Sequence, residues 1–503
     1  MKRWQLILPV ALCCGLLQPA YARAAEWETG AGIAVGGYYS DNICLAQQDE
    51  EDKWVGTARP DVSVRGRGAR GNVNLRAAAE YNSLGDSDLE CAVGQSAALT
   101  NRESVVPSVR FNSDYELVQD WLQVDLAATA RQTSINPFVP GGTTSGRDNT
   151  DIVYDYTAGA LLQRRLAQTA DLSLRYAYNE QLNSVDVNGD STEDRAEFDL
   201  ATLPDRGRLS VGVGGRYSKV NYEASDLRPA FDNTLSSAEL RAGLQFSSSW
   251  QLNALVGEEW NEFTSVRDDI EGDYWDVGVR WTPNTRVEVS VGTGERFFGS
   301  TPRADIRYRH KRSELSASYA RTLSFPRNLR AGDSGFVEPG DPFDPDFGEL
   351  PGDPLGEEGL PTFIGNSPIL NERFDLRYRF AARRTTITLS GSDSRQRRIE
   401  DDAEATFRNV GVTFSRNLSS LLTANLRLSW DEREGSGGDL GGAGGFGGFG
   451  QASEAWRAGF GFSRRLGNDT TVNVAYQFLT RESDFALNDY DENRVTFNVR
   501  HAF

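Results

Sequence analysis

Two cysteines are the residues of this sequence best placed to form a covalent bond. The chain has 4 Cys, of which Cys13 and Cys14 lie in an N-terminal segment that we expect to be cleaved. The remaining pair, Cys44 and Cys91, falls in two long polar segments that we place on the same side of the fold. Because an export signal leads the chain, we expect an oxidising compartment in which disulfides persist. We therefore predict a Cys44–Cys91 disulfide, with two unpaired thiols as the alternative.

Hydrolytic chemistry has one weak candidate. The segment 332–335 reads Gly-Asp-Ser-Gly and resembles the surroundings of a serine-protease nucleophile, but Ser334 would need a histidine within hydrogen-bond reach. The chain has only 2 His, and both His310, in a short turn, and His501, near the chain end, lie away from that segment in the predicted fold. The glycine-rich run 441–450 lacks the Lys-Ser/Thr of a phosphate-binding loop. The sequence predicts a protein that is not an enzyme and has no cofactor.

Carboxylates gather in the segment 322–372, the longest stretch without a repeating pattern. Its acidic residues are Glu338, Asp341, Asp344, Asp346, Glu349, Asp353, Glu357 and Glu358. Such a run either stays solvated at the surface or folds inward as a constriction that favours cations. Asp186, Asn188 and Asp190 show the faint spacing of a calcium loop, but Gly189 stands at the fourth place rather than the sixth, so no metal site is predicted.

The N-terminus reads as a secretory signal peptide over residues 1–24. Lys2 and Arg3 form a positive region, residues 6–17 are apolar, and Ala-Arg-Ala at 22–24 supplies a cleavage site. A membrane-spanning helix needs about 20 apolar residues, and no other segment provides them. We expect residues 25–503 to form the exported domain.

Apolar and polar residues alternate along that domain in stretches of about ten residues, the length of a membrane-crossing strand. In the stretch 72–82, Leu75 and Tyr81 point to one face while Arg76 and Glu80 point to the other. Each such stretch therefore has one apolar and one strongly polar face. This alternation fits a soluble β-sandwich as well as a barrel.

The connections favour the barrel. Short turns such as 66–71 and 204–207 alternate with long polar loops such as 132–150 and 434–453, the latter rich in glycine. A transmembrane barrel sorts its connections in this way, with turns on the periplasmic side and loops outside. We predict an all-β, transmembrane, antiparallel up-and-down β-barrel of about 22 strands, within roughly 20 to 24. Because strands begin near Trp27, no plug domain is expected, and a secreted soluble β-protein is the alternative.

Tryptophan and the chain end support the same fold. Each Trp after the signal peptide lies within a residue or two of a proposed strand end, as expected for aromatic girdles at the two membrane interfaces. These residues are Trp27, Trp54, Trp121, Trp250, Trp260, Trp275, Trp281, Trp430 and Trp456. The terminal Phe503 resembles the aromatic signal that the barrel-assembly machinery reads, although His501 stands where Tyr is usual.

Arginines occupy the predicted lumenal face. The candidates are Arg76, Arg175, Arg280, Arg377, Arg379 and Arg427. A guanidinium holds carboxylates in fixed geometry and could also bind phosphate or uronate groups of a passing polymer. Cross-strand ion pairs that stiffen the wall are the alternative, and arginines near the outer rim could hold lipopolysaccharide phosphates.

Several segments resemble a family of outer-membrane barrels that accompanies PEP-CTERM/exosortase sorting systems and exopolysaccharide gene clusters. They are Ser40-Asp41-Asn42-Ile43 and residues 54–66, 371–398 and 409–430. The resemblance is one of repeat style along the whole exported domain, and it brings no functional residues with it. It implies an accessory role in exporting or organising surface polysaccharide.

The expected function is thus a non-enzymatic channel or scaffold in the outer membrane of a Gram-negative bacterium. A general or solute-specific porin is the first alternative, and a structural or adhesive surface barrel is the second. Expected partners are outer-membrane lipid, lipopolysaccharide and the barrel-assembly machinery, with polysaccharide or export-system proteins as further candidates. The net charge of −19 argues against nucleic acid.

Overall fold

The computed structural model describes most of the exported domain. The described residues are 25–84, 91, 104–141, 145–146, 149–167, 169–185, 189–202, 207–225, 229–267, 269–330, 362, 365, 367–436 and 452–503. The predicted signal peptide lies outside them.

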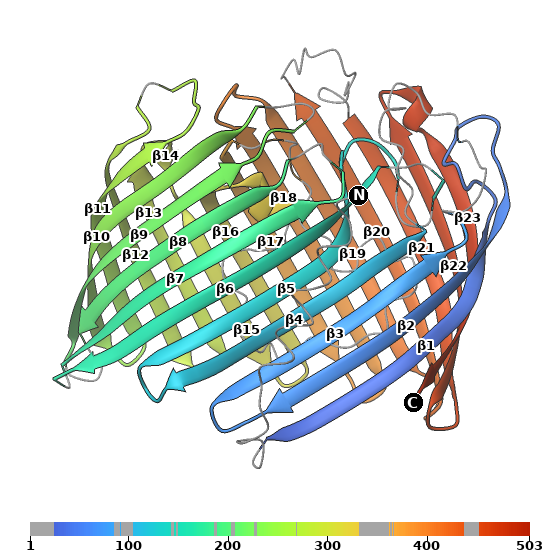
Figure 1. Cartoon of the computed structure of the whole chain (residues 1–503), viewed down its shortest axis with the longest axis horizontal. Coiled ribbons are helices and arrows are strands. Elements are labelled where there is room, and N and C mark those ends of the chain that lie inside the picture. Colours follow the sequence, from blue (N-terminus) through green and yellow to red (C-terminus); the bar gives the residue numbers. More distant parts are fainter. Residues whose placement is uncertain are drawn as a thin grey trace.

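The described chain is a closed antiparallel β-barrel (Figure 1). Each strand pairs with its neighbours in sequence, and the first strand pairs with the last from Gly32↔Ala502 to Ser40↔Arg494, which closes the sheet. Two of the 23 strands, β14 and β15, pair with β13 in one continuous register and form a single interrupted strand, so the barrel has 23 − 1 = 22 strands. The predicted fold and strand number are confirmed.

The first half of the barrel consists of β1 (Glu26–Ser40), β2 (Lys53–Arg67), β3 (Gly71–Asn82), β4 (Val105–Val118), β5 (Leu122–Ser134), β6 (Thr150–Leu166), β7 (Ala170–Asn183), β8 (Ser191–Thr202), β9 (Leu209–Tyr222), β10 (Phe231–Ser247), β11 (Trp250–Glu262) and β12 (Gly272–Asn284). The second half consists of β13 (Val287–Arg296), β14 (Gly299–Ser300), β15 (Arg303–His310), β16 (Ser313–Ser324), β17 (Ile369–Ala381), β18 (Thr385–Arg398), β19 (Glu404–Asn417), β20 (Leu422–Ser436), β21 (Ala452–Leu466), β22 (Thr470–Ser483) and β23 (Tyr490–Ala502).

The two ends of the barrel differ in their connections. Short turns and the C-terminus lie at the lower end in Figure 1, and the long loops lie at the upper end. The strands extend further into the two longest predicted loops than the sequence suggested. β16 runs to Ser324 and β17 starts at Ile369, while β20 runs to Ser436 and β21 starts at Ala452.

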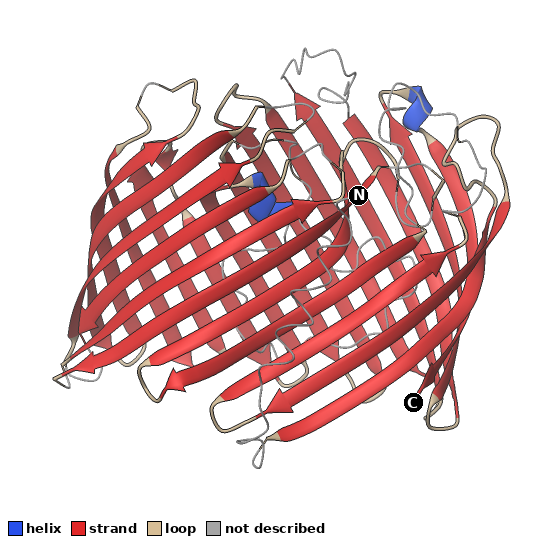
Figure 2. Ribbon diagram, viewed as in Figure 1, coloured by secondary structure: helices blue, strands red, loops and turns tan. Residues whose placement is uncertain are grey.

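Two short helices accompany the barrel (Figure 2). The helix α2 (Pro326–Arg330) follows β16 and lies within the outline of the barrel, whereas the 3-10 helix η3 (Ala486–Asn488) lies at the upper rim. No described helix combines the length and the apolar character needed to cross a membrane. The described residues contain no separate plug domain, but α2 shows that loop segments enter the lumen.

The outer face of the barrel is apolar. On β11, Leu252 and Val256 are 43% and 57% exposed, whereas Glu259 on the opposite face is 1% exposed. An exposed band of this kind on every side of a barrel is suited to contact with lipid chains rather than water. The strand register therefore assigns the polar face of each strand to the lumen.

Tryptophans lie at two levels of this outer face. Trp27, Trp121, Trp250 and Trp281 are beside short turns, and Trp54, Trp260, Trp275 and Trp456 are within four residues of the long-loop ends of their strands. Trp430 differs from the prediction, because β20 continues for six residues beyond it to Ser436. Cross-strand pairing brings Trp250 against Trp281, with ring centroids 5.7 Å apart. Phe503 continues the outer face of β23 at the short-turn end and is 80% exposed.

Pro107 lies inside β4 without breaking it. It is paired with Ala79 of β3, but the ladder between β4 and β5 begins only at Val109↔Ala130. Pro107 therefore sits where one side of the strand is unpaired, which is where a residue without an N–H is tolerated. The strands β4 and β5 thus form a hairpin whose one register shift lies between Glu116 and Val118.

Candidate functional site

The lumenal wall is held together by ion pairs that reach over glycines. Arg175 on β7 extends across Gly159 on β6 to Asp125 on β5, with Arg175 Nη2 3.1 Å from Asp125 Oδ2. A Cβ added at Gly159 would lie 2.6 Å from that carboxylate oxygen, so the bridge needs glycine on the middle strand. The charges are thereby matched along the wall instead of projecting into the lumen.

The same arrangement recurs around the barrel. Its other examples are Arg500–Gly32–Asp61, Arg241–Gly214–Asp199 and Arg303–Gly292–Asp276. Each joins an arginine to a carboxylate two strands away. Part of the high glycine content of the strands is explained by this need for a flat middle strand.

The strand register places all the predicted lumenal arginines on the lumenal face: Arg76, Arg175, Arg280, Arg377, Arg379 and Arg427. They do not form one cluster. Arg175 and Arg280 have acidic partners, Arg280 Nη2 lying 2.5 Å from Glu288 Oε1. Arg377 and Arg379 lie on β17, and Arg427 lies on β20.

A buried apolar cluster lies inside the barrel at its long-loop end. It joins residues from the β5–β6 loop, from α2, from β17 and from β19 and the loop before it: Phe138, Leu329, Ile369, Ala403, Ala405 and Phe407. The rings of Phe138 and Phe407 are 5.8 Å apart between centroids. Since β5 and β19 are far apart in the barrel order, the β5–β6 loop must cross the lumen to make this contact.

Backbone carbonyls of that loop are pinned to the opposite wall. Arg481 on β22 donates a 2.6 Å hydrogen bond to the carbonyl oxygen of Phe138, and Arg433 on β20 donates one to that of Pro137. Within the loop, Asn149 Nδ2 donates to the carbonyl of Val139 at 2.8 Å and so keeps the loop compact. The crossing is fixed by directed, charge-assisted bonds as well as by apolar contact.

One carboxylate organises these arginines. Asp431 pairs with Arg457, and its Oδ2 lies 3.5 Å from Arg433 Nε. Arg481 Nη2 also donates to Ser453 Oγ at 3.0 Å. The side chains of Asp431 and Arg457 are only 10% and 13% exposed, so the group is shielded from water.

The segment after β16 makes a second crossing. Phe325 packs with Val220 and Tyr222 of β9. Arg327 is 1% exposed and donates to Asn179 Oδ1 on β7, and its carbonyl accepts a hydrogen bond from Gln181. We call the described residues of the β5–β6 loop (135–141, 145, 146 and 149) and residues 325–330 the crossing segments, because both reach across the lumen and share the apolar cluster.

The loops above the crossing segments are tied to one another. The disulfide predicted between Cys44 and Cys91 is present, with a Cα–Cα distance of 5.3 Å, and it joins the β1–β2 and β3–β4 loops. Gly146 N donates to the carbonyl of Ile43 at 2.6 Å, which attaches the first crossing segment to the disulfide-linked loops. Val266 N similarly donates to the carbonyl of Ile399 at 3.1 Å.

The disulfide gives a direct prediction. The denatured full chain should migrate faster on a gel without dithiothreitol than with it, because the cross-link closes a loop with a sequence separation of 47 and makes the unfolded chain more compact. A Cys44→Ser/Cys91→Ser variant should migrate alike in both conditions and serves as the control. Wild-type mobility that ignores the reductant would contradict the bond.

The first crossing segment escaped the sequence reasoning, although one signal was present. The second is the start of the segment 322–372, for which folding into the lumen was one of two expectations; its described residues 325–330 do lie inside the barrel, and its acidic residues 338–358 lie outside the described part of the chain. Phe407, Val220 and Leu235 are large apolar residues on the lumenal face whose cross-strand neighbours are polar. In a strand with one lipid-facing and one water-facing side, such a residue must be covered from within the lumen. These breaks in the alternation mark where loops pack against the wall.

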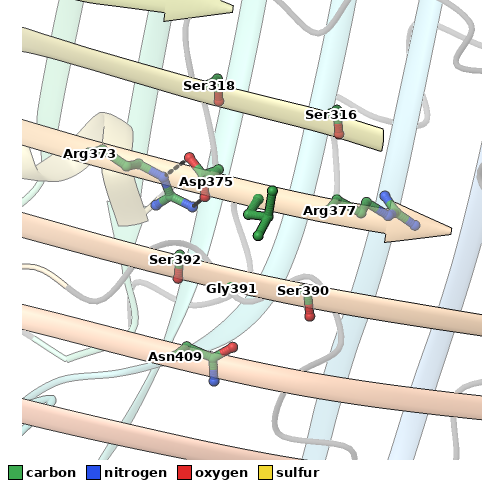
Figure 3. A pocket seen from close by; sticks show the side chains of 10 residues that line it. Ser316, Ser318, Arg373, Asp375, Arg377, Ser390, Gly391, Ser392 and Asn409 are labelled. Atoms are coloured by element: carbon green, nitrogen blue, oxygen red, sulfur yellow. Dashed lines mark hydrogen bonds and ion pairs between the residues drawn. The ribbon is translucent and has the colours of Figure 1, made fainter. Parts of the chain in front are cut away.

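A cavity of about 360 Å³ opens on the lumenal wall across β16–β19 (Figure 3). Two arginines, one aspartate, one leucine and one glycine line it together with small polar residues: Ser316, Ser318, Arg373, Asp375, Leu376, Arg377, Ser390, Gly391, Ser392 and Asn409. Asp375 accepts hydrogen bonds from Arg373 at 2.5 and 2.6 Å. The predicted lumenal Arg377 is part of this cavity, whereas Arg379 is not.

Several predicted residues lie outside the described part of the chain. They are Ser334, Asp186, Asn188 and the acidic residues 338–358 of the long loop. Asp190 is described, and its carboxylate accepts a 2.8 Å hydrogen bond from Asn183 N. Among the described residues, no group of His, Cys, Asp and Glu is arranged to hold a metal ion.

No protein-family model and no curated protein matches the sequence. Several solved structures have a similar fold, although only about a tenth of their aligned residues are identical to those of this chain. The siderophore receptor PirA from Acinetobacter baumannii has a TM-score of 0.50 at 10% identity, with 95% of this chain and 80% of that chain covered. The FrpB iron transporter from Neisseria meningitidis has 0.51 at 11% identity, with 94% and 81% covered.

A variant of the ferric enterobactin receptor PfeA from Pseudomonas aeruginosa gives 0.50 at 10% identity, with 95% and 80% covered. These proteins are described as receptors or transporters and not as enzymes. At this identity the likeness establishes the fold alone: the chain has an outer-membrane-type β-barrel.

Proposed function

We propose that the protein spans the outer membrane of a Gram-negative bacterium and serves as a gated channel for acidic surface polysaccharide. Its membrane location is supported by the exposed apolar band, the two levels of Trp and the sorting of turns and loops. Transport as the class of activity is supported by the barrel fold, because the structures that it resembles are named as receptors and transporters.

The observation that carries the gating proposal is the pair of crossing segments. A permanently open porin would leave its lumen clear, but here Phe138 and Leu329 share an apolar cluster between strands that are far apart in the barrel. The arginines that hold the Phe138 loop bind carbonyl oxygens, which are weaker partners than carboxylates or phosphates. An anionic polymer could therefore compete for these arginines and release the loop.

The polysaccharide class rests on two supports. Lumenal arginines offer paired N–H donors that match carboxylate and phosphate groups. The sequence also resembles barrels that accompany exopolysaccharide gene clusters, which favours export or organisation of such a polymer over uptake of a small solute. In this proposal, polymer reaches the lumen from the short-turn side.

Efflux from lipid vesicles tests the proposal. Vesicles loaded with fluorescent oligogalacturonate or with neutral dextran of equal length would carry either the full chain or a variant whose crossing segments are shortened. We expect slow efflux through the full chain, faster efflux through the variant, and preference for oligogalacturonate in both. Efflux that is equal to that of protein-free vesicles for both proteins would overturn the channel proposal, and equal rates for the two polymers would overturn the acidic substrate.

A further inference from the structure

The cavity on the lumenal wall has a regular construction. Strand pairing aligns Ser316, Arg377 and Ser390 in one row across β16, β17 and β18. The next row toward the long-loop end aligns Ser318, Asp375 and Ser392, and it continues to Asn409 on β19. The hollow therefore consists of two neighbouring rows of polar side chains on adjacent strands, each with one charged residue between two serines.

Small residues on both sides make this part of the wall concave. In the Arg377 row, Ser390 is followed by Gly411 on β19, where an added Cβ would lie 2.9 Å from Ser390 Oγ. The volume of about 360 Å³ is at the lower end of the range of about 300–1,000 Å³ that ligand pockets occupy. The hollow is large enough for a small ligand, and most of its lining side chains carry hydroxyl, amide, guanidinium or carboxylate groups, with Leu376 as the one large apolar residue.

The cavity holds more positive than negative side chains, two arginines against one aspartate. Arg373 and Asp375 satisfy each other through two hydrogen bonds, so neither leaves a net charge in the hollow. Arg377 has no ion-pair partner among the described residues, and Figure 3 shows its guanidinium apart from the Arg373–Asp375 pair. Arg377 is also exposed to the lumen. A fork of N–H donors is thus left free beside several hydroxyl groups.

We propose that this cavity binds a sugar unit carrying a carboxylate, with Arg377 holding the carboxylate and the serines and Asn409 bonding to ring hydroxyls. A guanidinium binds a carboxylate through two parallel hydrogen bonds, and hydroxyl and amide side chains both donate and accept, as a saccharide requires. This inference rests on the proposed function, because the acidic sugar that it assigns to the cavity is the substrate class proposed for the channel.

The cavity lies directly below the apolar cluster. The row that precedes Asp375 contains Arg373, Ser394 and Phe407, and Phe407 belongs to the cluster formed with the crossing segments. A polymer that arrives from the short-turn end would meet Arg377 before it meets the crossing segments. The cavity is therefore placed to hold an acidic sugar unit beneath the closed end of the lumen.

Calorimetric titration of the full chain in lipid nanodiscs tests the site. The probes are trigalacturonate, neutral maltotriose and inorganic phosphate, and the variants are Arg377→Gln and Arg377→Lys. The matched control is Arg379→Gln, which removes the same charge from the same face of β17 outside the cavity. We expect trigalacturonate to bind the wild type and the control alike, to bind Arg377→Gln about tenfold or more weakly, and to show intermediate affinity for Arg377→Lys.

Maltotriose should bind far more weakly than trigalacturonate, and phosphate should bind more weakly because it lacks the sugar. Equal affinity of wild type and Arg377→Gln for trigalacturonate would overturn the site. Phosphate binding as tight as that of trigalacturonate would reduce it to a simple anion site. Vesicle efflux separates the two proposals: efflux without trigalacturonate binding removes only the site, and binding without efflux removes only the channel.

Discussion

Shortening both crossing segments is expected to turn a poorly conducting barrel into a wide pore. The variant replaces residues 136–148 and 326–366 by short Gly-Ser linkers and leaves the ends of β5, β6, β16 and β17 intact. It removes Phe138 and Leu329, the two loop residues of the apolar cluster, and it removes the carbonyls that Arg433 and Arg481 hold. What remains is the wall of a 22-strand barrel.

The expected magnitude follows from the geometry of that wall. Twenty-two strands spaced about 4.8 Å apart and tilted about 40° enclose a backbone diameter of roughly 45 Å. Porins of about 16–18 strands already leave an aqueous channel. Single-channel currents of the double variant in planar bilayers should therefore exceed those of such porins under the same salt, while the full chain should stay well below them.

The control changes a rim loop that does not cross the lumen. Residues 484–489 form hydrogen bonds with neighbouring strands, including Asp484 N to the carbonyl of Ala452 at 3.0 Å. Shortening this loop should leave the current at the wild-type level. A double variant that conducts no better than this control would show that the crossing segments are not the barrier.

The two shortenings should not be additive. Both segments contribute to one buried cluster, so removal of either exposes apolar surface of the other and loosens it. Each single variant should therefore give more than half of the conductance gained by the double variant. Measuring the conductance of the wild type, the two single variants and the double variant completes a double-mutant cycle. The cycle tests whether the apolar cluster couples the two crossing segments.

The barrel itself was predictable because its signals are local. Side chains in a strand alternate between faces, so an apolar/polar period of two can be recognised within a stretch such as 72–82 without knowledge of its partners. Turn lengths add the sorting of the two ends, which a sandwich does not require. The Cys44–Cys91 bond followed from the same topology, because both cysteines lie in long-loop connections.

The crossing segments were not predictable in the same way because their contacts are remote in sequence. Phe138 and Arg481 are separated by 343 residues, and Pro137 and Arg433 by 296. No periodic pattern within a loop shows that it will enter the lumen, and a lumenal apolar residue such as Phe407 shows only that some segment must cover it. The cavity was missed for a related reason: the serines of β16 and β18 look like an ordinary polar face until strand pairing aligns them in rows with Arg377 of β17.

Replacing Asp431 by Asn is expected to destabilise the barrel by about 3–5 kcal/mol, the usual cost of removing one partner from a buried ion pair. Asp431 is the carboxylate that Arg457 and Arg433 share, and Arg481 is held nearby through Ser453. Without its charge, shielded guanidinium groups would face one another without compensation. Urea titration of folding into lipid vesicles, followed by Trp fluorescence and by heat-modifiable gel mobility, measures the loss.

Asp171→Asn is the matched control, since it removes a carboxylate from the same face of the barrel. Its partner Arg165 is 3.2 Å away, but the two side chains are 64% and 52% exposed. Exposed pairs contribute about 0–1 kcal/mol, because water screens them and because ordering two mobile side chains costs entropy. A loss for Asp431→Asn no larger than that for Asp171→Asn would contradict the role of Asp431 as the organising charge.

A second substitution shows how much of the loss comes from the uncompensated charge of Arg457 and how much comes from the missing Asp431 carboxylate itself. Arg457→Met in the Asp431→Asn background removes the guanidinium whose partner was lost, and it keeps much of the side-chain volume. Because a buried charge left without its partner is what costs stability, removal of the Arg457 guanidinium should recover part of the loss. Arg433 and Arg481 would still lack their carboxylate, so the hold on the carbonyls of Pro137 and Phe138 should stay weakened. The double variant is therefore expected to be more stable than Asp431→Asn and yet to conduct more than the wild type, which distinguishes a charge that holds the lumen closed from one that only stabilises the wall.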